Sequence, residues 1–233
     1  MKKLNFRNWK KFGFEFLSIF IAVVAAFTLN NWNENRKADN SENKILIEIV
    51  NGLEKDLEDL KENKLGHKYG ILACNYFRKA LSDKNLSPDS LGIYYSSLTR
   101  DFISIQNTAG YETLKSRGLE LIKNDSLRLH IISLYEFDYQ ILRKLEEEYS
   151  EMQFQENYFK EINKSLAPNF NFNDKNMISG IKLPIKIPND EKKIFLLYLM
   201  KIQGNRSYII NYYNQIEKKV VDVKNEIKKE IKR

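Results

Sequence analysis

The longest apolar run of the chain lies between Phe12 and Trp32 and reads FGFEFLSIFIAVVAAFTLNNW. As a helix it would extend about 31 Å, close to the thickness of the hydrocarbon layer of a bilayer. Only basic charges precede Phe12, whereas charges of both signs follow Trp32. Basic residues favour the cytoplasmic side of a membrane. The pattern therefore predicts a basic cytoplasmic leader at residues 1–11, a transmembrane anchor at residues 12–32 and an exported remainder.

The ends of the run carry residues typical of a membrane interface. Trp9 and Trp32 bracket it, and Lys10 and Lys11 adjoin Trp9. Indole rings and lysine side chains are stable at the level of the lipid headgroups. We therefore expect a single-pass protein of the cell inner membrane with its C-terminal domain in the periplasm. A cleaved signal peptide is the alternative, because Val24-Ala25-Ala26 resembles a cleavage site.

One face of the predicted anchor carries small residues and an acid. Glu15, Ser18, Ala22 and Ala26 recur at helical spacing. Small side chains allow a second helix to approach closely, and an acid within a membrane is a candidate functional group. This face is a candidate contact with another transmembrane helix. One alternative is that the small residues share this face by chance. Another is that Glu15, near the helix N-terminus, only pairs with Lys11 one turn away.

Two heptad patterns follow, one directly after the anchor and one at the end of the chain. Apolar residues recur at alternating steps of four and three, as in the seam of a coiled coil. The seam positions are Leu46, Val50, Leu53, Leu57 and Leu60, then Tyr213, Ile216, Val220, Val223 and Ile227. We expect a stalk helix at residues 33–64 and a long C-terminal helix at residues 191–233 that packs back on it. Antiparallel pairing would set Leu46 beside Ile227 and Leu60 beside Tyr213, and bring basic residues 228–233 toward the headgroups. The alternative is a parallel dimer through the first seam.

Between the seams, residues 65–164 predict a helical bundle. Helical patterns cover 65–81, 88–99 and 108–117, with Gly118 placed to end the third. Asn124 is a candidate cap for a long helix that extends to about Ile162. Residues 165–190 hold three of the four prolines, in part at alternate positions, which excludes a central strand. They predict an extended segment laid across the bundle and a candidate binding loop. The fold class is thus all-α.

Composition and charge exclude several functional classes. The formal net charge is +7, but the leader carries five basic residues, so the rest has 33 basic and 31 acidic residues. A chain that is nearly neutral outside its leader does not predict nucleic-acid binding. The single cysteine, Cys74, lies among apolar residues and is interpreted as a buried thiol, with an intermolecular bridge or a reactive thiol as the alternative.

Several motifs resemble an uncharacterised family of single-pass membrane proteins of Bacteroidota. The acid Glu15, the apolar run and the Asn-Asn-Trp-Asn-Glu sequence at residues 30–34 carry the resemblance. It continues in Tyr111, Leu114, Lys115 and Gly118, then Asn124, Leu127 and Arg128. The resemblance spans the first half of the chain. It implies the same membrane topology and cellular setting, and no activity.

Residues that would carry chemistry are few. His67 and His130 stand in different predicted helices with no pattern of further ligands, so each is interpreted as solvated or at the edge of the core. The acids at 146–148 and at 54–62 are interpreted as solvated helix faces. No catalytic, phosphate-binding or metal motif is present. We therefore expect neither an enzyme nor a cofactor.

Two functional classes remain. The first is a membrane-anchored scaffold or accessory subunit that presents its exported domain to a protein partner, or to a second copy of itself, in the envelope. The second is a membrane-tethered sensor that binds a small-molecule ligand and signals through a partner helix. The sequence gives the ligand of the second class no direct support.

Overall fold

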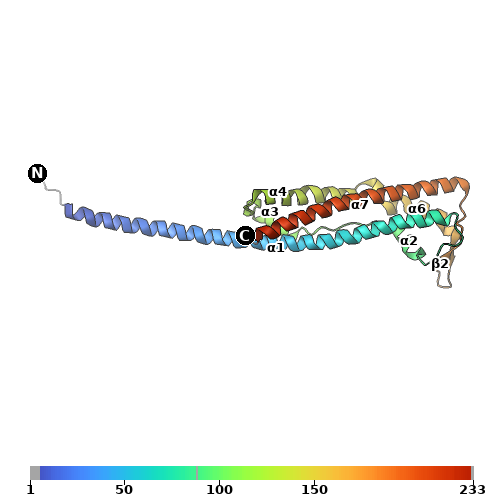
Figure 1. Ribbon diagram of the computed structural model, residues 1–233, viewed down its shortest axis with the longest axis horizontal. Coiled ribbons are helices and arrows are strands. Elements are labelled where there is room, and N and C mark those ends of the chain that lie inside the picture. Colours follow the sequence, from blue (N-terminus) through green and yellow to red (C-terminus); the bar gives the residue numbers. More distant parts are fainter. Residues whose placement is uncertain (1–5, 88, 232–233) are drawn as a thin grey trace.

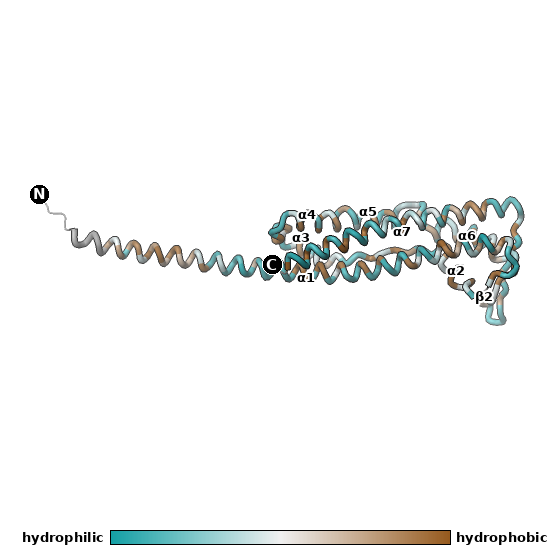
Figure 2. The backbone as a smooth tube through the Cα atoms, viewed as in Figure 1, coloured by the Kyte–Doolittle hydropathy of each residue, from teal (hydrophilic) through white to brown (hydrophobic). Residues whose placement is uncertain are grey.

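The computed structural model describes residues 6–87 and 89–231, with side chains from Phe12 onward, and is all-α as predicted. A single long helix extends from an elongated helical bundle (Figure 1). This helix, α1, spans Phe6–Ala80 and contains 75 residues. It would measure about 112 Å at the rise of an ideal helix. Its first part makes no contact with the rest of the chain and carries the apolar run (Figure 2).

Helix α1 passes through residue 64 without a break, so the predicted helices at 33–64 and 65–81 are one element. Gly66 and Gly70 lie inside it and allow close approach of two side chains. A Cβ atom on Gly66 would stand 2.3 Å from the Phe102 ring, and one on Gly70 would stand 2.2 Å from Nε of Arg206. These contacts offset the destabilisation that glycine causes inside a helix.

The second long helix, α7 (Asn189–Ile231), runs antiparallel to α1 along the bundle (Figure 1). Cross-helix pairs define the directions: Lys228 pairs with Glu54 at 2.7 Å, and Lys64 bonds to Asn214 at 3.2 Å. All seam residues are buried except Leu57, which is half-buried. Each seam is covered by the same chain, which leaves the first seam no surface for a parallel dimer.

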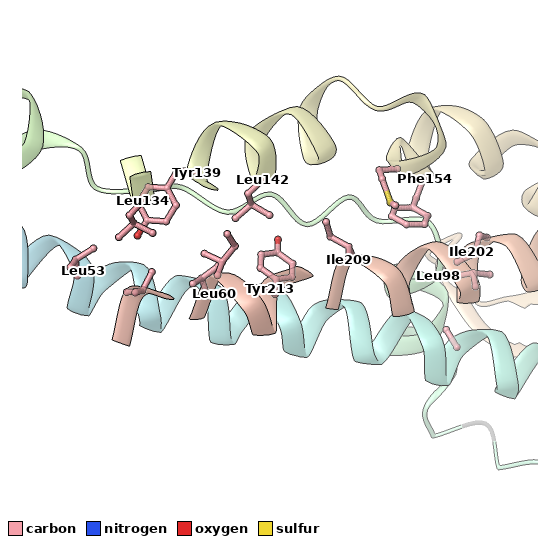
Figure 3. Packing of buried hydrophobic residues seen from close by; sticks show 14 of the residues in the cluster. Leu53, Leu60, Leu98, Leu134, Tyr139, Leu142, Phe154, Ile202, Ile209 and Tyr213 are labelled. Atoms are coloured by element: carbon pink, nitrogen blue, oxygen red, sulfur yellow. The ribbon is translucent and has the colours of Figure 1, made fainter. Parts of the chain in front are cut away.

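The ion pair between Glu54 and Lys228 corrects the expected register of the two helices. Glu54 lies eight positions beyond Leu46 in α1, about 12 Å along the axis, so Ile227 faces the region near residue 54. Figure 3 shows Leu60 and Tyr213 in the same part of the core, but the Tyr213 ring lies 5.6 Å from the ring of His67, seven residues beyond Leu60. Glu54 is also about 33 Å beyond Trp32 along α1. Lys228 therefore does not reach the headgroups, while Lys232 and Arg233 lie outside the described residues.

Shorter elements cover the α1–α7 pair. Helix α2 spans Leu91–Leu98 and α3 spans Ala109–Arg117, which ends at Gly118 with a φ of 100°. A 3-10 turn, η1, follows at Leu119–Leu121. Helix α4 spans Asp125–Ser133, and the Asn124 side chain accepts a bond from the backbone of Leu127, as expected of a cap.

The long helix expected from Asn124 to about Ile162 is interrupted. A π-helical turn, η2 (Leu134–Asp138), leads into α5 (Tyr139–Glu147), and a 3-10 turn, η3 (Ser150–Met152), precedes α6 (Phe154–Leu166). The carboxylate of Asp101 accepts a 2.7 Å bond from the amide of Phe154 at the start of α6. This cap comes from a distant segment, so helical periodicity gives no sign of the break.

Residues 165–190 contain a small hairpin that the sequence did not predict. A 3-10 turn, η4 (Ala167–Asn169), leads into β1 (Phe170–Phe172), which pairs antiparallel with β2 (Ile178–Ile181). Phe170 is partnered with Ile181, and both are buried. The strands lie between Pro168 and Pro184, and residues 182–188 after β2 belong to no helix or strand.

Candidate functional site

The candidate membrane-spanning part of α1 has only exposed side chains among its described residues. Every residue from Phe12 to Trp32 is exposed, and α1 is the one helix of the described residues long and apolar enough to span a membrane. Ser18 donates its hydroxyl proton to the carbonyl of Glu15 at 2.8 Å. The guanidinium of Arg36 lies 5.8 Å from the centroid of the Trp32 ring. The side chains of Trp9, Lys10 and Lys11 fall outside the described ones.

The unbroken helix fixes how the small face of the anchor is oriented relative to the bundle. Ala22 and Ile47 are about seven turns apart, so they lie on the same side of α1. Ile47 is exposed, whereas its neighbours Leu46 and Ile49 are buried. The face with Glu15, Ser18, Ala22 and Ala26 is thus turned away from the bundle, and no part of the described chain covers it.

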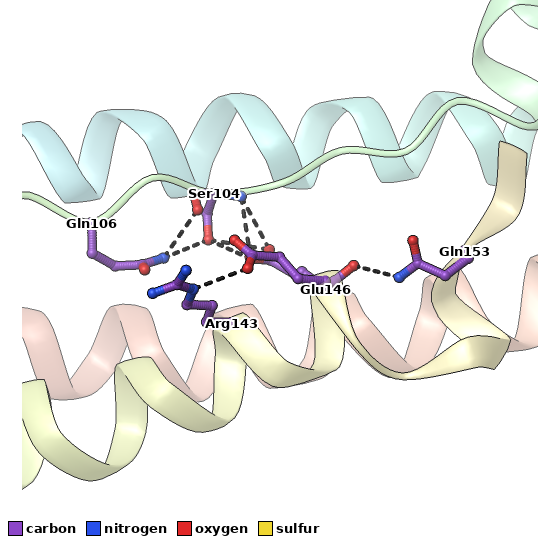
Figure 4. A network of polar contacts seen from close by, with 6 residues as sticks. Ser104, Gln106, Arg143, Glu146 and Gln153 are labelled. Carbon is purple, nitrogen blue, oxygen red and sulfur yellow. Dashed lines mark hydrogen bonds and ion pairs between the residues drawn. The ribbon is translucent and has the colours of Figure 1, made fainter. Parts of the chain in front are cut away.

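A polar centre inside the bundle surrounds Glu146, which is buried and does not lie on a solvated face as its sequence pattern predicts. Its carboxylate accepts bonds from the amide and the hydroxyl of Ser104, and Gln153 donates to its backbone carbonyl (Figure 4). The hydroxyl of Tyr213 also donates to this carboxylate. Burial raises the pKa of Glu146 to about 7, and these hydrogen bonds oppose the rise.

A second buried acid, Asp56 of α1, was also expected to face solvent. Its carboxylate accepts a 2.6 Å bond from the Tyr139 hydroxyl and a 2.7 Å bond from the amide of Asn107. Burial raises its pKa to about 6. The neighbouring Asp59 accepts a 3.0 Å bond from the amide of Ile105.

Together these acids hold the irregular segment at residues 100–108 between α1 and α5. The segment belongs to no helix or sheet, so its amides need acceptors elsewhere. Glu146, Asp59 and Asp56 supply them for Ser104, Ile105 and Asn107. Carboxylates that accept hydrogen bonds from backbone amides in this way hold the segment in place. Their oxygens are engaged by the chain itself, so the role of these acids is structural.

A third centre is the fully buried guanidinium of Arg206. One terminal nitrogen donates to the carbonyls of Ser97, Leu98 and Arg100, and the other lies 3.0 Å from Nδ1 of His67. Burial lowers the pKa of His67 to about 3, so the imidazole is neutral. The guanidinium carbon also lies 4.1 Å from the centroid of the Phe154 ring. Arg206 thereby satisfies the carbonyls at the end of α2 and joins α2, α6 and α7 to α1.

A cleft opens between α7 and the π-helical turn. Its volume is about 230 Å³, and its lining includes His130, Asp138, Lys219, Asp222 and Glu226. His130 lies 2.7 Å from Glu226, and Lys219 pairs with the nearly buried Asp138. The two pairs bridge the helices across the cleft, and His130 is half-exposed, in line with its expected place at the edge of the core. π-Helical turns often occur at functional sites.

The last candidate groups are the single thiol and possible metal ligands. Cys74 is fully buried, and its surroundings raise the pKa of the thiol to about 12, which suits the expected inert thiol. Among the described residues, no group of three or more His, Cys, Asp or Glu side chains is arranged to hold a metal ion.

Comparisons with protein-family models, with curated proteins and with solved structures find no match.

Proposed function

We propose that the protein is a membrane-anchored scaffold or accessory subunit that presents its exported helical domain to a protein partner in the envelope. The observation that carries the proposal is the continuity of α1, which is at once the anchor and a core helix of the bundle. Glu42, the first buried residue of the bundle, follows Trp32 by about 15 Å of free helix. A rigid helix of this kind holds the bundle at a fixed height above the membrane.

The use of the buried polar groups supports a scaffold. Glu146 and Asp56 bind amides of the irregular segment, and Arg206 binds carbonyls at the end of α2. These groups stabilise one arrangement of the helices and are engaged by the chain itself. In this proposal the protein has no catalytic activity, and its function lies in its surfaces.

A ligand-binding sensor is the second candidate, and the cleft beside the π-helical turn is the observation that favours it. The cleft is large enough for a small molecule and holds charged groups of both signs. In this candidate the protein signals through a partner helix. The face with Glu15, Ser18, Ala22 and Ala26 would then be the contact for that helix.

Isolation of the full chain from native membranes in mild detergent tests the two candidates together. A protein that copurifies at a fixed stoichiometry supports the scaffold. A small molecule found by mass spectrometry in the purified chain, and lost on Asp222→Lys substitution in the cleft, supports the sensor. A chain that isolates alone, with neither companion, overturns both.

A further inference from the structure

Helix α7 carries an uncovered apolar ridge at the end of the bundle farthest from the anchor. Ile194, Leu197 and Tyr208 are about half exposed, at 49%, 49% and 54% of their surface. Ile194, Leu197, Lys201, Gly204 and Tyr208 follow one another at steps of three and four, which places them on one face of α7. Solvated helix faces rarely gather so many large apolar side chains, and such patches mark interaction sites.

A groove adjoins the ridge, between α7 and the η3–α6 segment. Its main hollow has a volume of about 360 Å³ and is lined by Tyr158, Leu197, Tyr198 and Lys201 among others. A smaller hollow beside Ile194 shares Tyr198 with the first. The Tyr158 and Tyr198 rings, 5.7 Å apart at their centroids, form an aromatic contact within the main hollow. Helix α6 has 13 residues, so the groove can take about 18 Å of a docked helix.

Contacts within the chain join the two walls of the groove at both of its ends. Asn205 donates a 2.7 Å bond to the carbonyl of Glu151 at one end, and Lys164 lies 3.6 Å from Glu191 at the other. The walls between them are therefore joined and preorganised. A preorganised groove lowers the entropy cost of binding.

The charges on the α7 side identify the kind of occupant. Lys201 stands within the ridge, between Leu197 and Gly204, and Lys193 borders it. Neither ammonium has an ion pair or hydrogen bond among the described residues, whereas Lys164 across the groove is paired. A docked helix would bury Lys201, and a buried charge needs a partner of opposite sign. The occupant must therefore carry a carboxylate within its own apolar stripe.

Symmetry argues against a second copy of this chain as the occupant. Two copies anchored in one membrane are related by an axis along the membrane normal, so their α7 helices would pack in parallel. Each ridge residue would then meet its own counterpart, and Lys201 would face Lys201 of the other copy. Like charges in direct contact within an interface are destabilising.

We propose that the α6–α7 groove binds an amphipathic helix of a second, different protein, and that Lys201 pairs with an acidic residue in the apolar stripe of that helix. The proposal rests on the proposed scaffold function and assigns its docking surface. Apolar anchors at the spacing of Ile194, Leu197 and Tyr208 would supply the affinity. The pairing with Lys201 would supply specificity and fix the register.

Site-specific photocrosslinking in native membranes tests the groove. A benzoylphenylalanine replaces Leu197 in the full chain, and the matched control replaces Leu129 of α4, which is 62% exposed. The expected result is a covalent adduct with one other protein from the Leu197 position only. Peptide mapping should place the crosslink on an amphipathic helix that contains Asp or Glu. Lys201→Glu should lower the adduct yield at least tenfold, and exchange of the partner's acidic residue for lysine should restore it.

Several results would overturn the proposal: no adduct above the Leu129 control, an adduct of two copies of this chain, an adduct with lipid, or a yield that Lys201→Glu leaves unchanged. Lys201 is exposed, so its exchange is expected to leave thermal unfolding of the chain unaltered, which the same preparations can verify. If a stoichiometric partner still copurifies with the Lys201→Glu chain, the groove assignment fails and the scaffold function stands. If no partner copurifies with either chain, both fail.

Discussion

The side chain of Arg206 lies directly against the backbone of Gly70. A Cβ atom on Gly70 would stand 2.2 Å from Nε of Arg206, a distance at which one of them must move. The guanidinium has little freedom to move, because it is fully buried and bonds to three carbonyls at and beyond the end of α2. The contact between these two residues therefore sets how closely α7 approaches α1.

Gly70→Ala is expected to destabilise the protein by about 3 kcal/mol, the upper range for overpacking of a core. Gly204→Ala is the matched control, since no atom lies within 4 Å of a Cβ at that exposed position of α7. There the higher helix propensity of alanine should stabilise by about 1 kcal/mol. Chemical denaturation of the full chain in detergent micelles measures both. Equal effects of the two substitutions would contradict the close contact.

Asp56 predicts a pH dependence of stability. Its folded pKa of about 6 lies above the usual value of 3.8, so the native protein holds a proton that the unfolded chain has lost. The stability from this group is fully present below pH 3.8 and is lost as the pH rises through 6. Asp56→Asn removes the titration. The stability of the natural protein relative to the variant should fall by about 2.4 kcal/mol between pH 4 and 7.5.

The comparison with the variant isolates Asp56 from other titrating groups. His67 has a lowered pKa and acts in the opposite sense, since its contribution is lost as the pH falls below 6.5. It is present in both proteins and cancels in their difference. Glu146, with a raised pKa, cancels in the same way. Denaturation curves at several pH values give the difference directly, and a difference independent of pH would refute the burial of an ionisable Asp56.

Helical periodicity was sufficient to predict the all-α class and the apolar seams, because packing of α1 on α7 repeats regularly along both helices. It does not predict the burial of Asp56, Glu146 and Arg206. Their backbone partners lie at the end of α2 and in residues 100–108, which belong to no helix or strand. A buried charge of this kind is defined by long-range contacts, which a single sequence does not display. The hairpin was missed for a related reason, since its strands are only three and four residues long.

The orientation of the anchor is expected to place the C-terminus outside the cytoplasm, because basic residues precede Phe12 and charges balance after Trp32. Alkaline phosphatase, which is active only after export, provides the measurement when fused after Arg233. High activity is expected. A stable fusion without activity, together with an active cytoplasmic reporter at the same position, would reverse the topology.

The small face of the anchor is expected to contact another transmembrane helix. Ala22→Ile would place a bulky side chain at the centre of that face and should weaken association severalfold. Val24→Ile, on the opposite side of the helix, serves as the control and should have little effect. Energy transfer between labelled chains, or recovery of a copurifying partner, measures the association. If both variants associate like the natural protein, the small residues have no role in contact.

Because α1 and α7 pack antiparallel, particular residues of the two helices are expected to lie close together within one chain. Glu54 pairs with Lys228, and Lys64 with Glu217, so cysteines at either pair should be joined by a short bis-maleimide linker. All four residues are at least partly exposed, and Cys74→Ser removes the buried thiol that would complicate the reaction.

The mismatched pair of Glu54 and Glu217 is the control. It is offset by about 16 Å along the helices and should react poorly. The expected product is a crosslinked monomer for the matched pairs, seen as faster migration on a denaturing gel. Crosslinks that join two chains, or equal reaction of the mismatched pair, would mean that the seams of α1 and α7 pair in another register or between molecules.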